Sequence, residues 1–160
     1  MLKITLLCVG SLKEPFLKDA VAEYEKRLKP YCKFSVTEVA DEKLDENASE
    51  AEKDAVKRRE GEKLLAHADD KGVLIALAIE GKRFSSEAFS ERIARYALGG
   101  KSHIQFVIGG SVGLHETVLN RADLNLSFSD MTFPHQLMRV ILAEQIYRSF
   151  KIQNGEPYHK

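Results

Sequence analysis

Five short apolar segments alternate with amphipathic segments along this chain. Leu2–Val9 and Val73–Ile79 are apolar at nearly every position, which is typical of strands that are covered on both faces. Lys33–Val39 alternates apolar and polar residues and predicts a strand near a sheet edge. Two further strands are expected at 104–108 and 124–128. Because helices cover both sides of sheets with such strands, the pattern predicts an α/β fold with a mainly parallel sheet.

The segments between the strands show the period of amphipathic helices. Helices are expected at 15–28, 49–66, 85–98, about 115–121, and from 134 to about 153,. The strand that begins at Val73 is expected to be closed by Glu80 and Gly81. The second helix mixes acids and bases, which indicates a solvent-exposed face. With 160 residues and neither a repeat nor a flexible linker, the chain is predicted to form one domain over residues 1–160.

The charge balance limits the partners that this chain can attract at long range. It has 24 Lys and Arg against 24 Asp and Glu, a formal net charge of zero, so no global positive field draws it to nucleic acid or anionic lipid. A nucleic-acid partner would need local basic groups or a site composed from two copies.

The two cysteines give no sign of a metal site. Cys8 and Cys32 lack the spacing of a metal site and are interpreted as reduced, buried thiols. We expect no metal, no membrane segment, no signal peptide and a cytoplasmic protein.

A glycine loop marks one of three strand ends where a ligand is expected, since ligands of parallel sheets gather at the carboxyl ends of strands. These ends are 77–81, 109–113 and 128–133. Gly109–Gly113 reads Gly-Gly-Ser-Val-Gly, which permits close backbone approach but matches neither phosphate-binding glycine motif. Asp130 lies where a ribose-binding acid is expected, yet too few residues follow it to complete a dinucleotide fold. A purely structural turn stays open as an alternative.

Two longer blocks, a helix segment and the C-terminus carry a family resemblance. The blocks are residues 106–115 (FVIGGSVGLH) and 126–139 (LSFSDMTFPHQLMR), the helix segment is 144–148 (EQIYR), and the chain ends Tyr-His-Lys. Over its whole length the chain resembles the RlmH (YbeA-like) family of SPOUT methyltransferases, which methylate N3 of a pseudouridine in 23S ribosomal RNA. The resemblance implies a deep C-terminal trefoil knot, a homodimer and S-adenosylmethionine held in the knot. The implied cofactor contacts are Leu77, Gly109, Phe128, Ser129, Asp130, Met131, Thr132 and Phe133, with Asp130 contributing its backbone.

Methyl transfer to a ring nitrogen requires alignment of the reactants and removal of the N3 proton, and it requires no metal. The resemblance implies that Tyr158 stacks on the target base and that His159 accepts or relays the proton. His135 and Arg139 lie one helical turn apart and are interpreted as contacts to RNA phosphates. Arg139 is also counted with Tyr158 and His159 as a catalytic candidate. A frayed tail, a helix-end histidine and a solvated arginine stay open as the alternative interpretations.

The helix from Pro134 to Gln153 is apolar on nearly all sides of its first half. It is either a central core helix or a helix shared between the core and a two-fold dimer contact.

The leading hypothesis for the function is an S-adenosylmethionine-dependent methyltransferase acting on 23S rRNA in assembled ribosomes. Alternatives are the same chemistry on another RNA such as tRNA, a ribosome-associated protein that binds without turnover, and a flavodoxin-like nucleotide binder.

Overall fold

The computed structural model describes residues 1–160 and contains one five-stranded sheet. All neighbouring strands are parallel, in the order β2-β1-β4-β3-β5. The α/β prediction with a parallel sheet is therefore confirmed, and β2 is an edge strand as its alternating pattern predicts. This order differs from the 2-1-3-4-5 order of flavodoxin-like folds, so the flavodoxin-like alternative is not supported. The strands are β1 (Lys3–Val9), β2 (Lys33–Val39), β3 (Val73–Arg83), β4 (His103–Ile108) and β5 (Leu124–Ser127).

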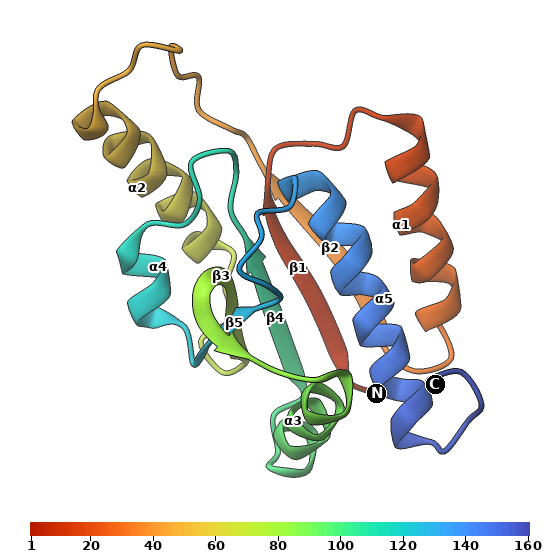
Figure 1. Ribbon diagram of the computed structural model, residues 1–160. Coiled ribbons are helices and arrows are strands. Elements are labelled where there is room, and N and C mark those ends of the chain that lie inside the picture. The colour runs from red at the N-terminus through yellow and green to blue at the C-terminus, as the bar shows by residue number, and fades with distance from the viewer.

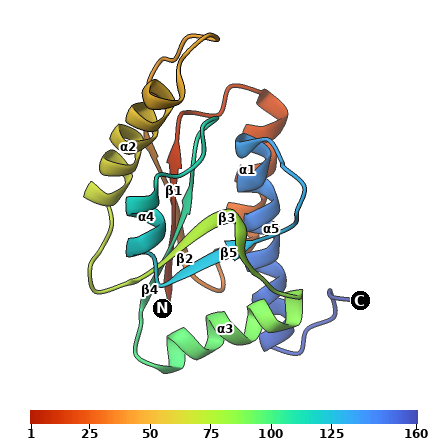
Figure 2. The ribbon, with the colours of Figure 1, turned by 60° about the vertical axis from the view of Figure 1, so that its left-hand side comes forward.

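Helices cover both faces of the sheet, as Figures 1 and 2 show. One layer contains α1 (Pro15–Leu28), α3 (Ser86–Leu98) and α5 (His135–Gln153), and the other contains α2 (Glu50–Ala66) and α4 (Glu116–Arg121). Within the first layer, α5 packs between α1 and α3. No helix has both the length and the apolar character that crossing a membrane requires.

Two apolar clusters, one on each side of the sheet, hold these layers together. Alternate residues of β1 belong to different clusters: Ile4 and Leu6 pack with α1, α3 and α5, whereas Leu7 packs with α2 and α4. Strand alternation therefore supplies both cores from the same segment. Local signals set the helix ends, because the Ser49 and Ser85 hydroxyls each accept a hydrogen bond, at 3.1 Å, from a backbone N–H in the first turn of α2 and α3,.

Strand β3 is longer than predicted, and the difference shapes one end of the sheet. The expectation that Glu80 and Gly81 close this strand was wrong, because it continues to Arg83. Leu77 and Lys82 both pair with Leu126 of β5, so the residues between them form a bulge,. A Cβ on Gly81 would lie 2.5 Å from the backbone oxygen of Asn125. Glycine at this position therefore permits a close approach of the two strands rather than ending one of them.

Candidate active site

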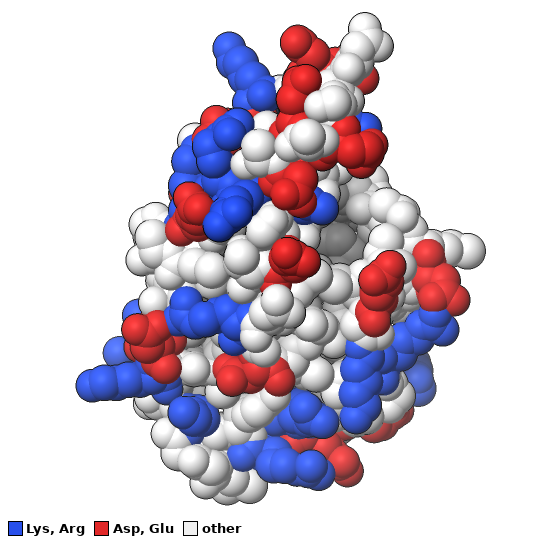
Figure 3. All heavy atoms as spheres, turned by 90° about the vertical axis from the view of Figure 1, so that its left-hand side faces the viewer, with Lys and Arg blue, Asp and Glu red and all other residues white.

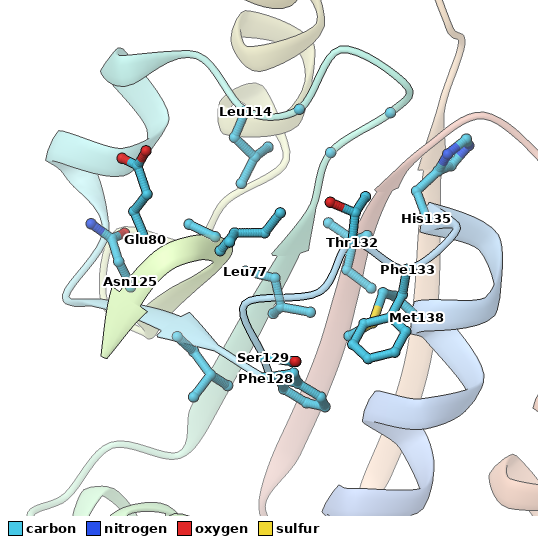
Figure 4. A pocket seen from close by; sticks show the side chains of 18 of the residues that line it. Leu77, Glu80, Leu114, Asn125, Phe128, Ser129, Thr132, Phe133, His135 and Met138 are labelled. Atoms are coloured by element: carbon cyan, nitrogen blue, oxygen red, sulfur yellow. The ribbon is translucent and has the colours of Figure 1, made fainter. Parts of the chain in front are cut away.

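The carboxyl ends of the strands surround a cavity of about 920 Å³. Its walls are the bulge of β3, the glycine loop (Gly109–Gly113) and the segment between β5 and α5, which are the three strand ends predicted to hold a ligand. Figure 4 shows Leu77 between the Thr132–Phe133 side and the side formed by Glu80, Leu114 and Asn125. The cavity brings together seven of the eight predicted cofactor contacts: Leu77, Gly109, Phe128, Ser129, Met131, Thr132 and Phe133.

Asp130 is the one predicted cofactor contact that does not line the cavity. Its side chain is exposed and forms an ion pair with Arg83, at the end of β3. The neighbouring backbone is ordered by side-chain contacts, because the Ser129 hydroxyl accepts a hydrogen bond from the Met131 N–H at 3.0 Å. The carboxylate of Asp130 therefore points away from the ligand space, which leaves only its backbone as a possible contact.

The glycine loop doubles back on itself at the end of β4. Gly113 has φ +82° and its N–H donates to the Gly110 carbonyl at 3.0 Å. A Cβ on Gly109 would lie 2.7 Å from the backbone carbon of Gly113, which is closer than a side chain tolerates. The loop therefore needs glycine at 109 for its own turn and at 113 for its positive φ, and its glycines bring main chain close to the cavity.

The cavity wall combines apolar side chains with a few polar groups, as ligand sites usually do. Asn125 on β5 donates from Nδ2 to the Leu119 carbonyl at 3.3 Å, while its buried Oδ1 has no hydrogen-bond partner. Glu80 lies on the same side of the cavity and is exposed. No pattern in the sequence singled out Asn125, because its position opposite the β3 bulge depends on the register of β3 and β5.

His135 lines the cavity at the start of α5. Burial, together with the nearby positive charge of Arg139, lowers the pKa of His135, and Asp41 opposes this effect. The imidazole is therefore neutral at pH 7, since its ordinary pKa is about 6.5. His135 therefore presents a neutral imidazole at the cavity.

Arg139 does not occupy the position that its spacing from His135 suggested. It is 1% exposed, and its guanidinium forms an ion pair with Glu38 of β2 and donates to the carbonyls of Val9 and Gly10, at 3.3 and 2.8 Å. The interpretation of Arg139 as an RNA-phosphate contact or catalytic group is therefore wrong for this structure. The side chain instead ties the first turns of α5 to the ends of β1 and β2.

The C-terminal tail is folded against α5 and α3 and is not frayed. The Tyr158 hydroxyl donates to Glu144 at 3.0 Å, its ring packs edge-on against Tyr147 with centroids 5.0 Å apart, and His159 lies between Arg148 and Glu87. Burial and the Glu144 carboxylate raise the pKa of Tyr158 to about 12, so its hydroxyl stays protonated. Neither Tyr158 nor His159 lines the cavity of its own chain.

Acidic and basic side chains are mixed around the hollowed face that Figure 3 presents. No region of one sign surrounds the hollow there. The arrangement agrees with the zero net charge and gives one chain little electrostatic attraction for a polyanion.

The chain is similar to known methyltransferases over its whole length. Residues 2–159 match the model of the family described as "Predicted SPOUT methyltransferase". The ribosomal RNA large subunit methyltransferases H of Bifidobacterium adolescentis and Clostridium novyi are each 57% identical to it over 99% of this chain and 100% of theirs.

Two solved structures share the fold at low sequence identity. A probable methylase family protein from Haemophilus influenzae covers 100% of this chain and 72% of its own, with a TM-score of 0.60 and 14% identity. The putative methyltransferase Lpg2936 from Legionella pneumophila, solved with bound SAM, covers 93% of this chain and 66% of its own, with a TM-score of 0.51 and 11% identity.

Proposed function

The chain belongs to the SPOUT methyltransferase family, and from that premise we propose that it transfers a methyl group from S-adenosylmethionine to N3 of a pseudouridine in 23S ribosomal RNA. The single observation that carries this proposal is the cavity at three strand ends, which gathers the residues implied as cofactor contacts. The relatives at 57% identity are named for methylation of large-subunit ribosomal RNA, which favours that substrate over tRNA and turnover over binding alone.

The residues around the cavity fit an adenosyl cofactor. The volume of about 920 Å³ lies within the roughly 300–1,000 Å³ of small-molecule sites. Leu77, Phe128 and Phe133 offer apolar surface, and the glycine loop offers main-chain groups at close range. The proposed cofactor contacts are these residues with Ser129, Met131, Thr132 and the backbone of Asp130.

The reaction needs alignment and the loss of one proton. The cofactor supplies an activated methyl group when it is bound. The chain must place N3 of the base in line with that group, which can contribute about 7–11 kcal/mol to lowering the barrier. The chain must also accept the N3 proton, and a positioned base contributes roughly 10²–10⁴-fold. We propose that His159 accepts this proton, that Tyr158 stacks on the base and that His135 contacts the RNA.

A homodimer would bring these groups together. In one chain the tail contacts Glu144, which lies six residues beyond the cavity residue Met138, or about 9 Å along α5,. Leu137, Val140 and Ile141 are only partly buried in one copy, which leaves α5 apolar surface for a second copy. We therefore propose that the tail of one copy acts at the cavity of its partner. Light scattering should give about twice the 18.0 kDa of one chain; a particle of single-chain mass at micromolar concentration would overturn the dimer.

We also propose that the C-terminal part forms the deep trefoil knot implied by the family. Support comes from the path of the chain, which leaves the edge strand β5, passes the glycine loop at the cavity and returns to α5 between α1 and α3. Pulling on both termini of single molecules tests this directly. A knotted chain extends to less than its full contour of roughly 3.3–3.6 Å per residue, whereas an unknotted chain reaches it.

Two measurements test the function as a whole. Calorimetry should show binding of S-adenosylmethionine but not of NAD or FMN. Mass spectrometry of 23S rRNA should show one methylated pseudouridine in wild-type cells that disappears on deletion of the gene and returns when the gene is restored. An unchanged rRNA mass spectrum in the deletion strain would contradict the proposed substrate, and the tRNA fraction would then be compared in the same way.

A further inference from the structure

A buried carboxyl group lies behind the glycine loop. Glu60, on α2, is 4% exposed. Its Oε2 accepts a hydrogen bond from the Glu42 N–H at 3.0 Å, whereas its Oε1 is buried without a hydrogen-bond partner. A Cβ on Gly110 would lie 3.4 Å from Oε1. The unpaired oxygen therefore faces a loop that forms one wall of the cavity.

The surroundings of Glu60 favour its neutral form. Burial is the main cause that raises the pKa of Glu60, and the charges of Asp41 and Glu42 add to it, against the Glu42 N–H and Lys63. The Lys63 ammonium is itself 3.2 Å from the Glu42 carboxylate. Since a buried carboxylate needs compensating partners, this set of neighbours is poorly suited to hold a negative charge.

Other elements packed near Glu60 bring no cation to it. The glycine loop has no titratable side chain. At the start of α4, His115 lies beside Gly61 and is 3.6 Å from Asp54. Arg139 of α5, whose guanidinium reaches the end of β1, is already paired with Glu38. The carboxyl group is therefore surrounded by groups that are neutral, negative or occupied.

A neutral carboxyl group has one donor and one strong acceptor. Because Oε2 accepts from Glu42, the proton is placed on Oε1, and a buried hydroxyl needs an acceptor. Gly110 of the glycine loop packs against Oε1, so the acceptor is sought among the backbone carbonyls of this loop.

We propose that Glu60, as a neutral acid, is a positioning residue whose Oε1–H donates to a backbone carbonyl of the glycine loop and holds Gly109 and Gly110 in the conformation that accepts the cofactor. Glu60 acts through the loop and touches neither cofactor nor RNA. This inference rests on the proposed function, because it needs S-adenosylmethionine as the ligand of the cavity.

The sharpest test compares an isosteric amide with an apolar side chain. Glu60→Gln keeps an acceptor for Glu42 and a donor for the loop, so it should bind S-adenosylmethionine with nearly wild-type affinity. Glu60→Leu keeps volume but no polar atom and should bind roughly tenfold more weakly or worse. Glu62→Gln is the matched control, since Glu62 is exposed on the same helix, and it should change nothing.

The pH dependence of S-adenosylmethionine binding distinguishes a Glu60 that donates a hydrogen bond in its neutral form from a Glu60 that only packs against the loop. Wild-type affinity should be high below the raised pKa of Glu60 and should fall as the pH rises through it, whereas Glu60→Gln should lack this loss over the same range. A second readout needs no cofactor. A carboxyl group with a raised pKa lowers the stability of the folded state as the pH rises. The difference in melting temperature between Glu60→Gln and wild type should therefore shift in favour of Glu60→Gln as the pH increases.

Three results would overturn the inference. Glu60→Gln could bind as weakly as Glu60→Leu, which would mean that a carboxylate is required. Glu60→Leu could bind as tightly as wild type, or wild type and Glu60→Gln could share one pH profile. Failure of the wild-type protein to bind S-adenosylmethionine at any pH would instead overturn the proposed function. Should Glu60→Leu not fold, the comparison of wild type with Glu60→Gln decides the matter.

Discussion

Nη1 of Arg148 lies 3.0 Å from Nδ1 of His159. Because a guanidinium only donates hydrogen bonds, Nδ1 must accept, and the proton of a neutral ring then sits on Nε2, which faces the Glu87 carboxylate,. Both ring nitrogens are thereby occupied. In its proposed role, His159 would accept a proton from the substrate only after its contact with Arg148 is broken.

Removal of Tyr158, His159 and Lys160 should spare cofactor binding but slow methylation. None of these residues lines the cavity of its own chain, and in the proposed dimer the tail of the partner serves the target base and not the cofactor, so calorimetry with S-adenosylmethionine should give a wild-type affinity. Methylation of ribosomes should slow at least roughly tenfold, or by about 1.4 kcal/mol of transition-state stabilisation. His159→Ala should cost less than the deletion, because Tyr158 remains, and Lys160→Ala is the control. Wild-type turnover by the shortened protein would make His135 the residue to test.

The same deletion should also lower stability. The contacts of Tyr158 with Glu144 and Tyr147 argue against the alternative interpretation of the tail as frayed. One hydrogen bond and one edge-on aromatic pair suggest a loss of about 1–2 kcal/mol in the free energy of unfolding. Urea denaturation measures it, and a midpoint equal to that of the wild-type protein would mean that the tail is detached in solution.

Replacement of Arg139 should destabilise the protein strongly. Arg139→Met removes the partner of Glu38 and the donor to the Val9 and Gly10 carbonyls, and breaking a buried ion pair costs about 3–5 kcal/mol. This range is an upper limit for the loss in the free energy of unfolding, because the Glu38 side chain is 41% exposed. Arg58→Met, at an exposed pair, should change the free energy of unfolding by less than about 1 kcal/mol. Equal urea midpoints for the two variants would contradict the structural role of Arg139.

Side chains at Gly109 should damage the cofactor site. Even Gly109→Ala places a Cβ 2.7 Å from the Gly113 backbone, so the loop must shift, and Gly109→Trp should also fill the adenosyl space. We expect about tenfold weaker S-adenosylmethionine binding for the first variant and none detectable for the second, with circular dichroism unchanged. Ser102→Ala is the control, because Ser102 is exposed just before β4 and does not line the cavity. A folded Gly109→Trp that binds within a few-fold of wild type would move the site elsewhere.

The two cysteines should resist alkylation in the folded protein. Burial raises the pKa of Cys8 to about 12, partly offset by Arg139, and burial likewise raises the pKa of Cys32 to about 12. The thiolate is the nucleophile, so iodoacetamide at pH 8 should add no mass to the native protein and two adducts in urea. Rapid labelling of either cysteine under native conditions would show that the core opens.

Much of the architecture follows from short-range patterns. The strands, the helix ends at Ser49 and Ser85, the edge position of β2 and the three strand ends of the cavity were predicted correctly. The lengths agree because apolar period and capping are properties of neighbouring residues. The β3 strand is the exception. Gly81 follows a run of apolar residues and was expected to end the strand, but the strand continues because it lies against β5, which is more than 40 positions away along the chain.

Side chains whose role depends on distant partners could not be assigned in this way. His135 and Arg139 share a helix face, but Glu38, 101 positions away, makes Arg139 a buried link and leaves only His135 at the cavity. Glu60 belongs to a helix that reads as solvated, and it becomes buried because Gly61 lets α2 approach α4 closely. A local sequence specifies which residues favour a helix, a strand or burial, whereas the charge state and contacts of a polar side chain depend on the groups that the fold brings to it.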